Sequence, residues 1–239
     1  MSRGRGRFLL LGSGEFEPWA GPAERLALGP ASGDGSVAIL ATASGREGQA
    51  VHDRWLAKGL AHFASLGIPS VAVPVRTRTE ALDPAGADRL DAVSMVFFSG
   101  GSPGYLAATL TETPIWEAVE RLLARGGVFA GCSAGAMIAG ARITPAGNSP
   151  LPFPFGSGMG LLPTTVVGVH WDAMSAWWIR WLRDLGPRRL APGLQFLGIA
   201  ENTAIASDGD RWSVFGAGDV EVRAGNQALT FRAGESFVV

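Results

Sequence analysis

Short apolar runs alternate with longer segments of mixed polarity along the first half of the chain. The clearest runs are residues 8–11, 37–41, 71–75, 93–98 and 128–130. Continuous apolar runs of this length are typical of strands buried on both faces, and the segments between them predict helices. Alternating strands and helices predict an α/β fold with a mostly parallel sheet that helices cover on both faces.

The second half of the chain has a different pattern. Residues 143–160 are rich in Pro, Gly, Asn and Ser and predict a loop long enough to shape or cover a pocket. Strands are expected again at 161–170 and 196–200, with an aromatic-rich helical segment at 171–185 between them. Short runs separated by Gly-rich turns then predict antiparallel hairpins appended to the sheet, at 203–207, 211–215, 220–222, 228–231 and 236–239. We expect one domain over 1–239, with a β-hairpin extension from about 203.

Composition excludes several classes of partner. Twenty basic and 21 acidic residues give a net charge of -1, so we expect no nucleic-acid partner and no binding to an anionic membrane. The first apolar run is too short for a signal peptide or a membrane span, so we expect a cytoplasmic protein. The single cysteine excludes a disulfide framework and a multi-cysteine metal site. Tryptophans at 177, 178 and 181 predict either packing in the core or a contact between two subunits. The second possibility would make the protein a homodimer.

A candidate nucleophile follows the strand at 128–130. The sequence Gly131-Cys132-Ser133-Ala134-Gly135 has the G-x-S-x-G spacing of a nucleophile elbow, a sharp turn from a strand into a helix. Cys132 is the alternative nucleophile, but the positions that flank it at the same spacing are alanines. The spacing therefore selects Ser133, and a Gly-rich turn without chemistry is the other interpretation of the motif.

A second Gly-rich turn, residues 99–104, follows the strand at 93–98. One helical region, 105–124, separates it from the elbow, so both turns should lie at the carboxyl ends of neighbouring strands. Ligands bind at that edge of open α/β sheets. The backbone N–H groups of Gly100 or Gly101 are candidates to stabilise an oxyanion together with that of Ala134, although the turn is equally compatible with an ordinary strand-to-helix connection.

A serine nucleophile needs a base, and His170 is the candidate because it ends an apolar strand. The other two histidines, His52 and His62, are ten residues apart in a predicted helix, so we expect them at the surface or half-buried. The chain has no acidic residue between Ser133 and His170, so the third member comes from elsewhere. Glu201 directly follows the strand at 196–200 and is favoured, and Asp172 is the alternative.

Several motifs resemble the peptidase E and cyanophycinase family of serine peptidases over nearly the whole chain. They are LLLGSGE, ATASG, FFSGG, GCSAGAM, VVGVHWD, GIAENTAI and DGDRWSVFGAGDVEV. The resemblance implies a class I glutamine amidotransferase-like fold, a triad of Ser133, His170 and Glu201, and no metal or organic cofactor. It implies hydrolysis of peptide bonds that follow aspartyl residues, in dipeptides or in the β-linked Asp-Arg polymer cyanophycin.

Two positions depart from the pattern of cyanophycinase-like members. Ser102-Pro103 follows the double glycine where those members carry an acidic or amide pair. Those members also carry arginines a few residues after the histidine, whereas the first arginines after His170 are Arg180 and Arg183. A substrate carboxylate requires a fixed cation or several hydrogen-bond donors. We take Gly100, Ser102 and Arg180 as candidate substrate-binding residues.

The sequence therefore predicts a serine hydrolase that acts on a small peptide substrate, with Gly101 and Ala134 forming the oxyanion hole. A non-catalytic small-ligand-binding or sensor protein on the same fold is one alternative, because a fold does not guarantee turnover. An amidase or esterase with an unrelated substrate is another.

Overall fold

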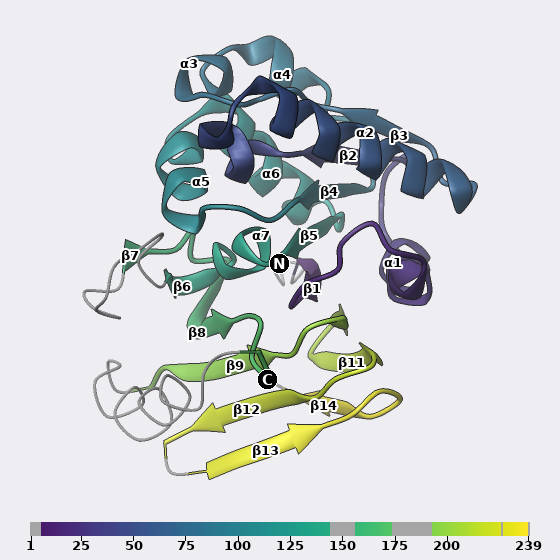
Figure 1. Cartoon of the computed structure of the whole chain (residues 1–239), viewed down its shortest axis with the longest axis vertical. Helices are drawn as coiled ribbons and strands as arrows, with labels where there is room; N and C mark the ends of the chain where they lie inside the picture. The colour runs from purple at the N-terminus through teal and green to yellow at the C-terminus, as the bar shows by residue number, and fades with distance from the viewer. Residues whose placement is uncertain (1–5, 144–155, 174–192, 226, 239) are drawn as a thin grey trace.

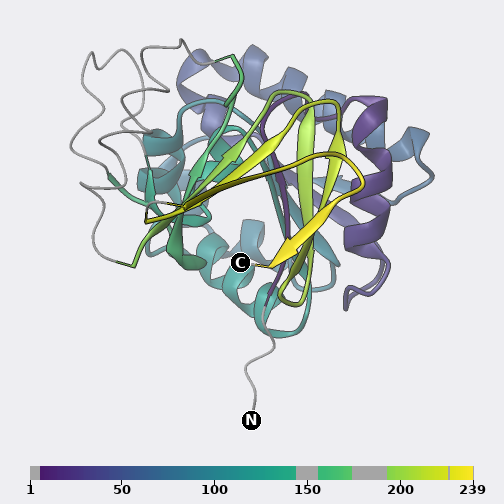
Figure 2. The same cartoon turned by 90° about the horizontal axis from the view of Figure 1, so that it is seen from below.

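The computed structural model describes residues 6–143, 156–173, 193–225 and 227–238. These residues form two β-sheets, with helices grouped around the larger one (Figure 1). Figure 1 shows β12 (Val220–Ala224) and β13 (Gln227–Phe231) of the smaller sheet at the opposite end of the molecule from α3 (Arg78–Ala81) and α4 (Pro84–Asp88), and Figure 2 looks onto the end where β12 and β13 lie. The predicted α/β class, with parallel strands between helices and antiparallel strands near the C-terminus, is confirmed.

The larger sheet has eight strands in the order β14-β11-β10-β1-β5-β4-β2-β3. Their bounds are β1 Arg7–Leu11, β2 Val37–Leu40, β3 Ser70–Ala72, β4 Met95–Phe98, β5 Val128–Cys132, β10 Thr203–Asp208, β11 Arg211–Gly216 and β14 Ser236–Val238. The β1, β5, β4, β2 and β3 strands are parallel to one another, and β10, β11 and β14 are antiparallel. Leu11 and Cys132 are paired at the ends of β1 and β5, so the turns that follow these strands share one edge.

The smaller sheet has six strands in the order β13-β12-β9-β8-β6-β7. Their bounds are β6 Gly140–Ile143, β7 Gly156–Ser157, β8 Leu162–Gly168, β9 Gln195–Ile199, β12 Val220–Ala224 and β13 Gln227–Phe231. The expectation that the later strands extend one sheet was therefore wrong for these strands. Few residues lie between the end of β5 and the start of β6, whereas a parallel crossover within one sheet needs about a dozen or more. The chain instead begins a second sheet with β6 at Gly140, and the sequence analysis did not predict this strand.

The helices and 3₁₀ turns lie between the strands. Their bounds are η1 Pro18–Ala20, α1 Gly21–Leu28, η2 Thr42–Glu47, α2 Gln49–Ser65, α3 Arg78–Ala81, α4 Pro84–Asp88, α5 Pro103–Leu110, α6 Pro114–Ala124 and α7 Ala134–Met137. The helical region expected at 105–124 is divided into two helices, α5 and α6. The Thr113 hydroxyl accepts a hydrogen bond from the Trp116 N–H, and Pro114 follows it, so Thr113 caps a new helix.

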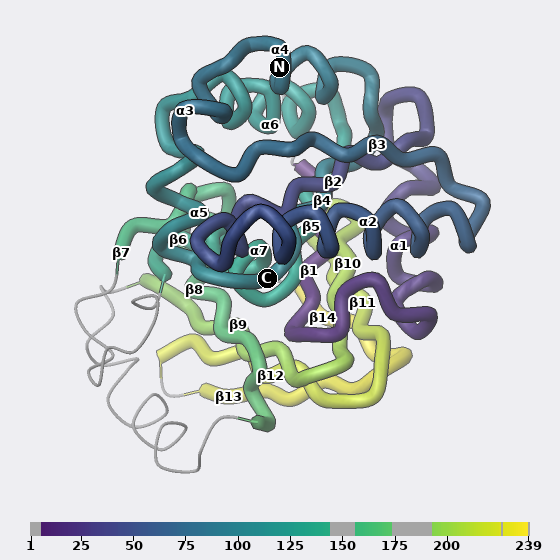
Figure 3. The backbone as a smooth tube through the Cα atoms, turned by 45° about the horizontal axis from the view of Figure 1, so that its top comes forward, coloured from purple at the N-terminus to yellow at the C-terminus, as the bar shows by residue number. Residues whose placement is uncertain are grey.

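Alternate side chains of β1 belong to two separate cores, because successive residues of a strand point to opposite faces. Leu9 and Leu11 pack with α1 and α2 on one face of the larger sheet. Phe8 and Leu10 belong to the core that includes α5, α6 and the smaller sheet. The α7 helix contacts both α5 and β8 (Figure 3), so the elbow lies where the two sheets approach each other.

Candidate active site

Ser133 connects β5 to α7 with a left-handed backbone, φ 50° and ψ −113°. Conformations of this kind cost about 1–3 kcal/mol and persist where the surroundings enforce them. A Cβ atom on Gly131 would lie 2.3 Å from the Gly135 carbonyl carbon, and one on Gly135 would lie 2.2 Å from the Phe98 carbonyl oxygen. Both glycines of the motif are therefore required by close backbone contacts, as the elbow predicts.

Substituting Gly135 by alanine is expected to lower the free energy of unfolding by about 2–3 kcal/mol, because backbone atoms cannot yield to the new methyl group. Gly29→Ala is the matched control, since Gly29 has φ −50° and its Cβ would meet only an ordinary contact at 3.4 Å. Urea denaturation of both variants measures the difference. Equal stability of Gly135→Ala and the wild type would show that the elbow is not constrained in this way.

Ser133, His170 and Glu201 are joined by two hydrogen bonds. The Ser133 Oγ lies 3.0 Å from His170 Nε2, and His170 Nδ1 lies 2.9 Å from Glu201 Oε1. With the proton on Nδ1, the imidazole donates to the carboxylate and leaves Nε2 free to accept the serine proton. The His170 and Glu201 side chains are 41% and 44% exposed, so a substrate can reach the imidazole from solvent.

The three residues come from both sheets. Ser133 follows β5 of the larger sheet, whereas His170 and Glu201 follow β8 and β9, which are parallel neighbours in the smaller sheet. The chain after Glu201 enters β10, which pairs antiparallel with β1. The smaller sheet thus presents the base and the acid at the edge where the larger sheet presents the serine.

Trp171 anchors the turn that carries His170, which itself has a positive φ of 52°. The Trp171 N–H donates to the Ile199 carbonyl oxygen at 3.1 Å, and the indole N–H donates to Glu221 at 3.3 Å. The ring also packs on Phe196, with centroids 4.8 Å apart. Sequence reasoning assigned Trp171 to a helical segment and missed this role.

Asp172 supports Glu201 and does not contact the imidazole. Its Oδ1 accepts a hydrogen bond from the Glu201 backbone N–H at 2.7 Å. The next N–H, that of Asn202, donates to the Ser13 hydroxyl at 3.0 Å, and the Gly12 N–H donates to the Thr203 carbonyl oxygen. The geometry therefore places Glu201, and not Asp172, against His170.

The N–H groups around Ser133 have different partners. The Ser133 N–H donates to the Leu11 carbonyl oxygen at 3.0 Å, and the Gly100 N–H donates to Glu15 Oε1 at 2.9 Å, so neither is available to an oxyanion. Ala134 begins α7, where a helical N–H has no intrahelical acceptor, and Gly101 is exposed. These two N–H groups remain the candidates for the oxyanion hole.

Ser102 has a structural role in the same turn. Its hydroxyl accepts from the Tyr105 N–H at 3.3 Å and caps α5, and its own N–H donates to the Ala43 carbonyl oxygen at 2.9 Å. Its contact with substrate stays a prediction. Arg180, Arg183 and the tryptophans at 177, 178 and 181 lie outside the described residues, as does most of the 143–160 loop.

Cys132 is fully buried, with its thiol 3.0 Å from Glu15 Oε2. Burial and the neighbouring Glu15 carboxyl group raise the pKa of the thiol well above its ordinary value. Because a cysteine reacts as the thiolate, this environment makes Cys132 a poor nucleophile.

The two remaining histidines are buried, so their expected exposure was wrong. His62 Nε2 lies 2.7 Å from Glu24 Oε2 in a buried pair between α1 and α2, and His52 is fully buried on α2. No group of three or more His, Cys, Asp or Glu side chains within the described ranges is arranged to hold a metal ion. No helix in those ranges is long and apolar enough to cross a membrane.

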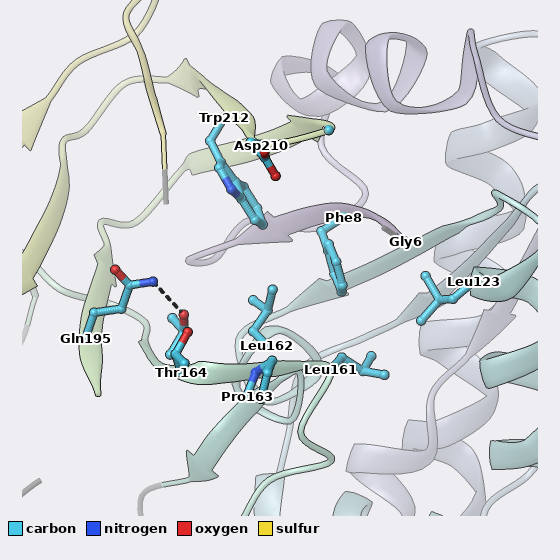
Figure 4. Close-up of a pocket in the computed structure, with 12 residues that line it drawn as sticks. Gly6, Phe8, Leu123, Leu161, Leu162, Pro163, Thr164, Gln195, Asp210 and Trp212 are labelled. Atoms are coloured by element: carbon cyan, nitrogen blue, oxygen red, sulfur yellow. Dashed lines mark hydrogen bonds between the residues drawn. The ribbon is translucent and has the colours of Figure 1, made fainter. Parts of the chain in front are cut away.

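A separate cavity of about 380 Å³ lies between the sheets (Figure 4). Its walls include Phe8 of β1, Trp212 of β11, and Leu161 and Leu162 at the start of β8. Gln195, the first residue of β9, donates to Thr165 at 3.0 Å beside it. The cavity therefore opens near the starts of β1, β8 and β9, whereas the triad lies beyond the ends of β5, β8 and β9.

Comparisons with known proteins agree on one family. The model of peptidase family S51 matches residues 9–215. The cyanophycinase of Trichormus variabilis is 29% identical over 169 residues, which are 67% of this chain and 55% of that protein. The cyanophycinase of Geminocystis herdmanii is 27% identical over 206 residues, 83% of this chain and 72% of that protein. The chain thus spans little more than half the length of the first of these relatives.

Two solved structures resemble all or most of the chain. The crystal structure of a peptidase from an acI-B1 Actinobacterium has a TM-score of 0.87 and 28% identity and covers 99% of both chains. That of a putative peptidase E protein from Listeria monocytogenes EGD-e has a TM-score of 0.64, covers 89% of this chain and 99% of its own, and is 16% identical. At that identity, the second likeness concerns the fold alone.

Proposed function

The chain belongs to peptidase family S51, a family of serine peptidases, and from this premise we propose that it hydrolyses small peptides through Ser133, His170 and Glu201. The observation that carries the proposal is the continuous hydrogen-bonded path from Ser133 Oγ through both imidazole nitrogens to Glu201 Oε1. A base in contact with the hydroxyl and an acid in contact with the base are the arrangement that activates a serine.

In the acylation step, Ser133 Oγ attacks the carbonyl carbon of the substrate while His170 Nε2 takes the hydroxyl proton. The carbonyl oxygen becomes an oxyanion and accepts hydrogen bonds from the N–H groups of Ala134 and Gly101. The C–N bond then breaks, and the proton on Nε2 passes to the leaving amine. Water attacks the acyl-enzyme by the same path, giving up a proton to Nε2, which returns it to Ser133 as the acid leaves.

We also propose that the residue on the acyl side of the cleaved bond is acidic, preferably aspartyl. The support within the described residues is Arg46, which is exposed and belongs to the η2 turn at the carboxyl end of β2. Its guanidinium lies 4.9 Å from the centre of the Tyr105 ring, a cation–π distance that restrains it. The hydrogen bond from Ser102 to Ala43 joins η2 to the Gly100–Gly101 turn beside Ser133. Arg46 is therefore a restrained cation at the edge that carries the triad.

Release of free amino acid from Asp-X, Glu-X, Gly-X and β-Asp-Arg dipeptides tests both parts of the proposal. We expect the wild type to prefer Asp-X. Arg46→Met should lower kcat/KM for Asp-X by about 10- to 100-fold, since a hydrogen bond to a charged group contributes about 1.5–3 kcal/mol. Hydrolysis of Gly-X should not change.

Arg121→Met is the matched control, because Arg121 is an exposed arginine of α6 that pairs with Asp91 at 3.4 Å. Equal hydrolysis of Asp-X and Gly-X by the wild type would reject the acidic specificity and leave the peptidase. An Arg46→Met variant that keeps the preference for Asp-X would reject the assignment of Arg46. No hydrolysis of any dipeptide would reject small peptides as the substrate class.

A further inference from the structure

A buried carboxyl group outside the triad lies next to the proposed nucleophile. Glu15 follows the Gly-rich turn after β1 and is only 7% exposed. Its Oε1 accepts a hydrogen bond from the Gly100 N–H at 2.9 Å, and its Oε2 accepts one from the Cys132 thiol at 3.0 Å. One side chain thus joins the turn after β4 to the last residue of β5, immediately before Ser133.

Gly100 is enclosed between Glu15 and Ser133. A Cβ atom on Gly100 would lie 3.0 Å from Glu15 Oε1 and 3.4 Å from Ser133 Cβ. On the other side of the turn, Gly101 has φ 141°, and a Cβ there would lie 2.5 Å from the Ala43 carbonyl group. The backbone around the Gly101 N–H is therefore enclosed between the Glu15 carboxyl group on one side and the η2 backbone at Ala43 on the other.

Two consecutive glycines form the most freely rotating dipeptide that a chain can contain. The N–H groups of Ser99 and Ser102 fix the two ends of this segment by donating to the carbonyl oxygens of Leu40 and Ala43. Without an acceptor for the Gly100 N–H, the peptide groups between these ends could turn their N–H groups away from the oxyanion position. A donor stabilises the transition state most when its direction is set before the reaction, because no reorganisation is then needed. The Glu15 carboxyl group supplies the acceptor that sets this direction.

We propose that Glu15 is a positioning residue that holds the Gly100–Gly101 segment in the geometry of the oxyanion hole. This inference rests on the proposed function of Ser133. Glu15 acts through Gly100 and does not touch the reacting atoms. Its second oxygen accepts a hydrogen bond from the Cys132 thiol and so fixes the carboxyl group relative to the elbow. The N–H groups of Gly101 and Ala134 are thereby held at a fixed distance from each other.

Two substitutions of similar volume separate the hydrogen bond from packing. Glu15→Gln retains an oxygen that can accept from the Gly100 N–H, whereas Glu15→Met fills a similar space and offers only a thioether sulfur, which is a weak acceptor. The measurement is the second-order rate at which a fluorophosphonate probe modifies Ser133, because that reaction uses the serine, the base and the oxyanion hole but no particular peptide. Dipeptide kcat and KM and the thermal midpoint are recorded in parallel.

We expect Glu15→Met to be modified about 10- to 100-fold more slowly than the wild type, since a small misplacement near the reacting atoms costs up to about 100-fold. Its kcat should fall by a similar factor with little change in KM, and Glu15→Gln should recover most of both rates. Glu24→Gln is the control for a buried glutamate with a purely structural partner, since Glu24 contacts His62 away from the triad. It should be modified at the wild-type rate whatever its thermal midpoint.

Equal rates for Glu15→Met and the wild type would overturn the role of Glu15 while the labelled serine still supported the proposed function. Slow modification of Glu15→Gln and Glu15→Met alike would also overturn it, because the accepting oxygen would then not matter. If Glu15→Met does not fold, Glu15→Asp gives the same comparison, since its shorter side chain withdraws from Gly100. A wild type that the probe leaves unmodified at Ser133 would overturn the proposed function and, with it, this inference.

Discussion

Ser133→Ala is expected to lower kcat by about 10⁴- to 10⁶-fold, the loss seen when the nucleophile of a serine triad is removed. Alanine cannot form the acyl-enzyme, so hydrolysis would depend on water activated by His170 alone. The substitution removes one half-exposed hydroxyl and leaves the contacts of Gly131 and Gly135 in place. Substrate affinity and thermal midpoint should therefore stay close to those of the wild type, as calorimetric binding and unfolding measurements can check.

Cys132→Ser is the informative neighbour of this variant. A serine hydroxyl at position 132 can donate to Glu15 as the thiol does, so we expect most of the activity to remain. Iodoacetamide at neutral pH should likewise inactivate the wild type slowly, because burial and Glu15 raise the pKa of the thiol. Loss of turnover in Cys132→Ser together with full turnover in Ser133→Ala would reverse the assignment of the nucleophile.

Glu201→Gln should lower kcat by about 10³- to 10⁴-fold, the effect of replacing the acid of a triad by its amide. The amide no longer stabilises the imidazolium, and its N–H₂ group can favour the tautomer in which Nε2 carries the proton and cannot accept one. KM should change little, since Glu201 is bonded to His170 and not placed to hold substrate. Steady-state kinetics on the best dipeptide gives both values.

Asp172→Asn is the matched control for Glu201→Gln, because asparagine keeps an oxygen that can accept from the Glu201 N–H. Its kcat should fall much less, because weakening one hydrogen bond raises the activation free energy by only about 1 kcal/mol. A larger loss in Asp172→Asn than in Glu201→Gln would mean that Asp172 is the acid of the triad.

The elbow was the part of the site best predicted from the sequence. Its local rule is steric: Gly131 and Gly135 must lack side chains wherever a strand turns sharply into a helix, whatever the rest of the fold. His170 and Glu201 were selected by a second local rule, since both follow apolar strands and ends of parallel strands share an edge, and the structure brings both side chains to Ser133. Neither rule required knowledge of which sheet each strand joins.

The division into two sheets could not be predicted in the same way. It depends on pairing of strands far apart in the sequence, and an apolar run does not specify its partner. A signal was nevertheless present, because too few residues follow Ser133 for a crossover back into the same sheet. The break between α5 and α6 also had a signal, the Thr113-Pro114 pair, which is typical of a helix start.

The contacts that support Ser133, His170 and Glu201 were missed for a different reason, although Asp172 itself was named as the alternative acid. Glu15, Trp171 and Asp172 act through contacts with Gly100, Ile199 and the Glu201 backbone, which only the folded chain brings together. A glutamate next to a Gly-rich turn is an ordinary surface residue by its type. Its burial and its two hydrogen bonds set it apart, and both are tertiary properties.

The most direct test of the account is to identify, by mass spectrometry of the digested protein, which residue a fluorophosphonate probe modifies. We predict one adduct, on Ser133, that is lost in Ser133→Ala and greatly slowed in His170→Ala, because the serine depends on the base 3.0 Å away in the other sheet. An unmodified wild type, an adduct on another residue, or labelling of Ser133 at an unchanged rate in His170→Ala would contradict a triad assembled from the two sheets.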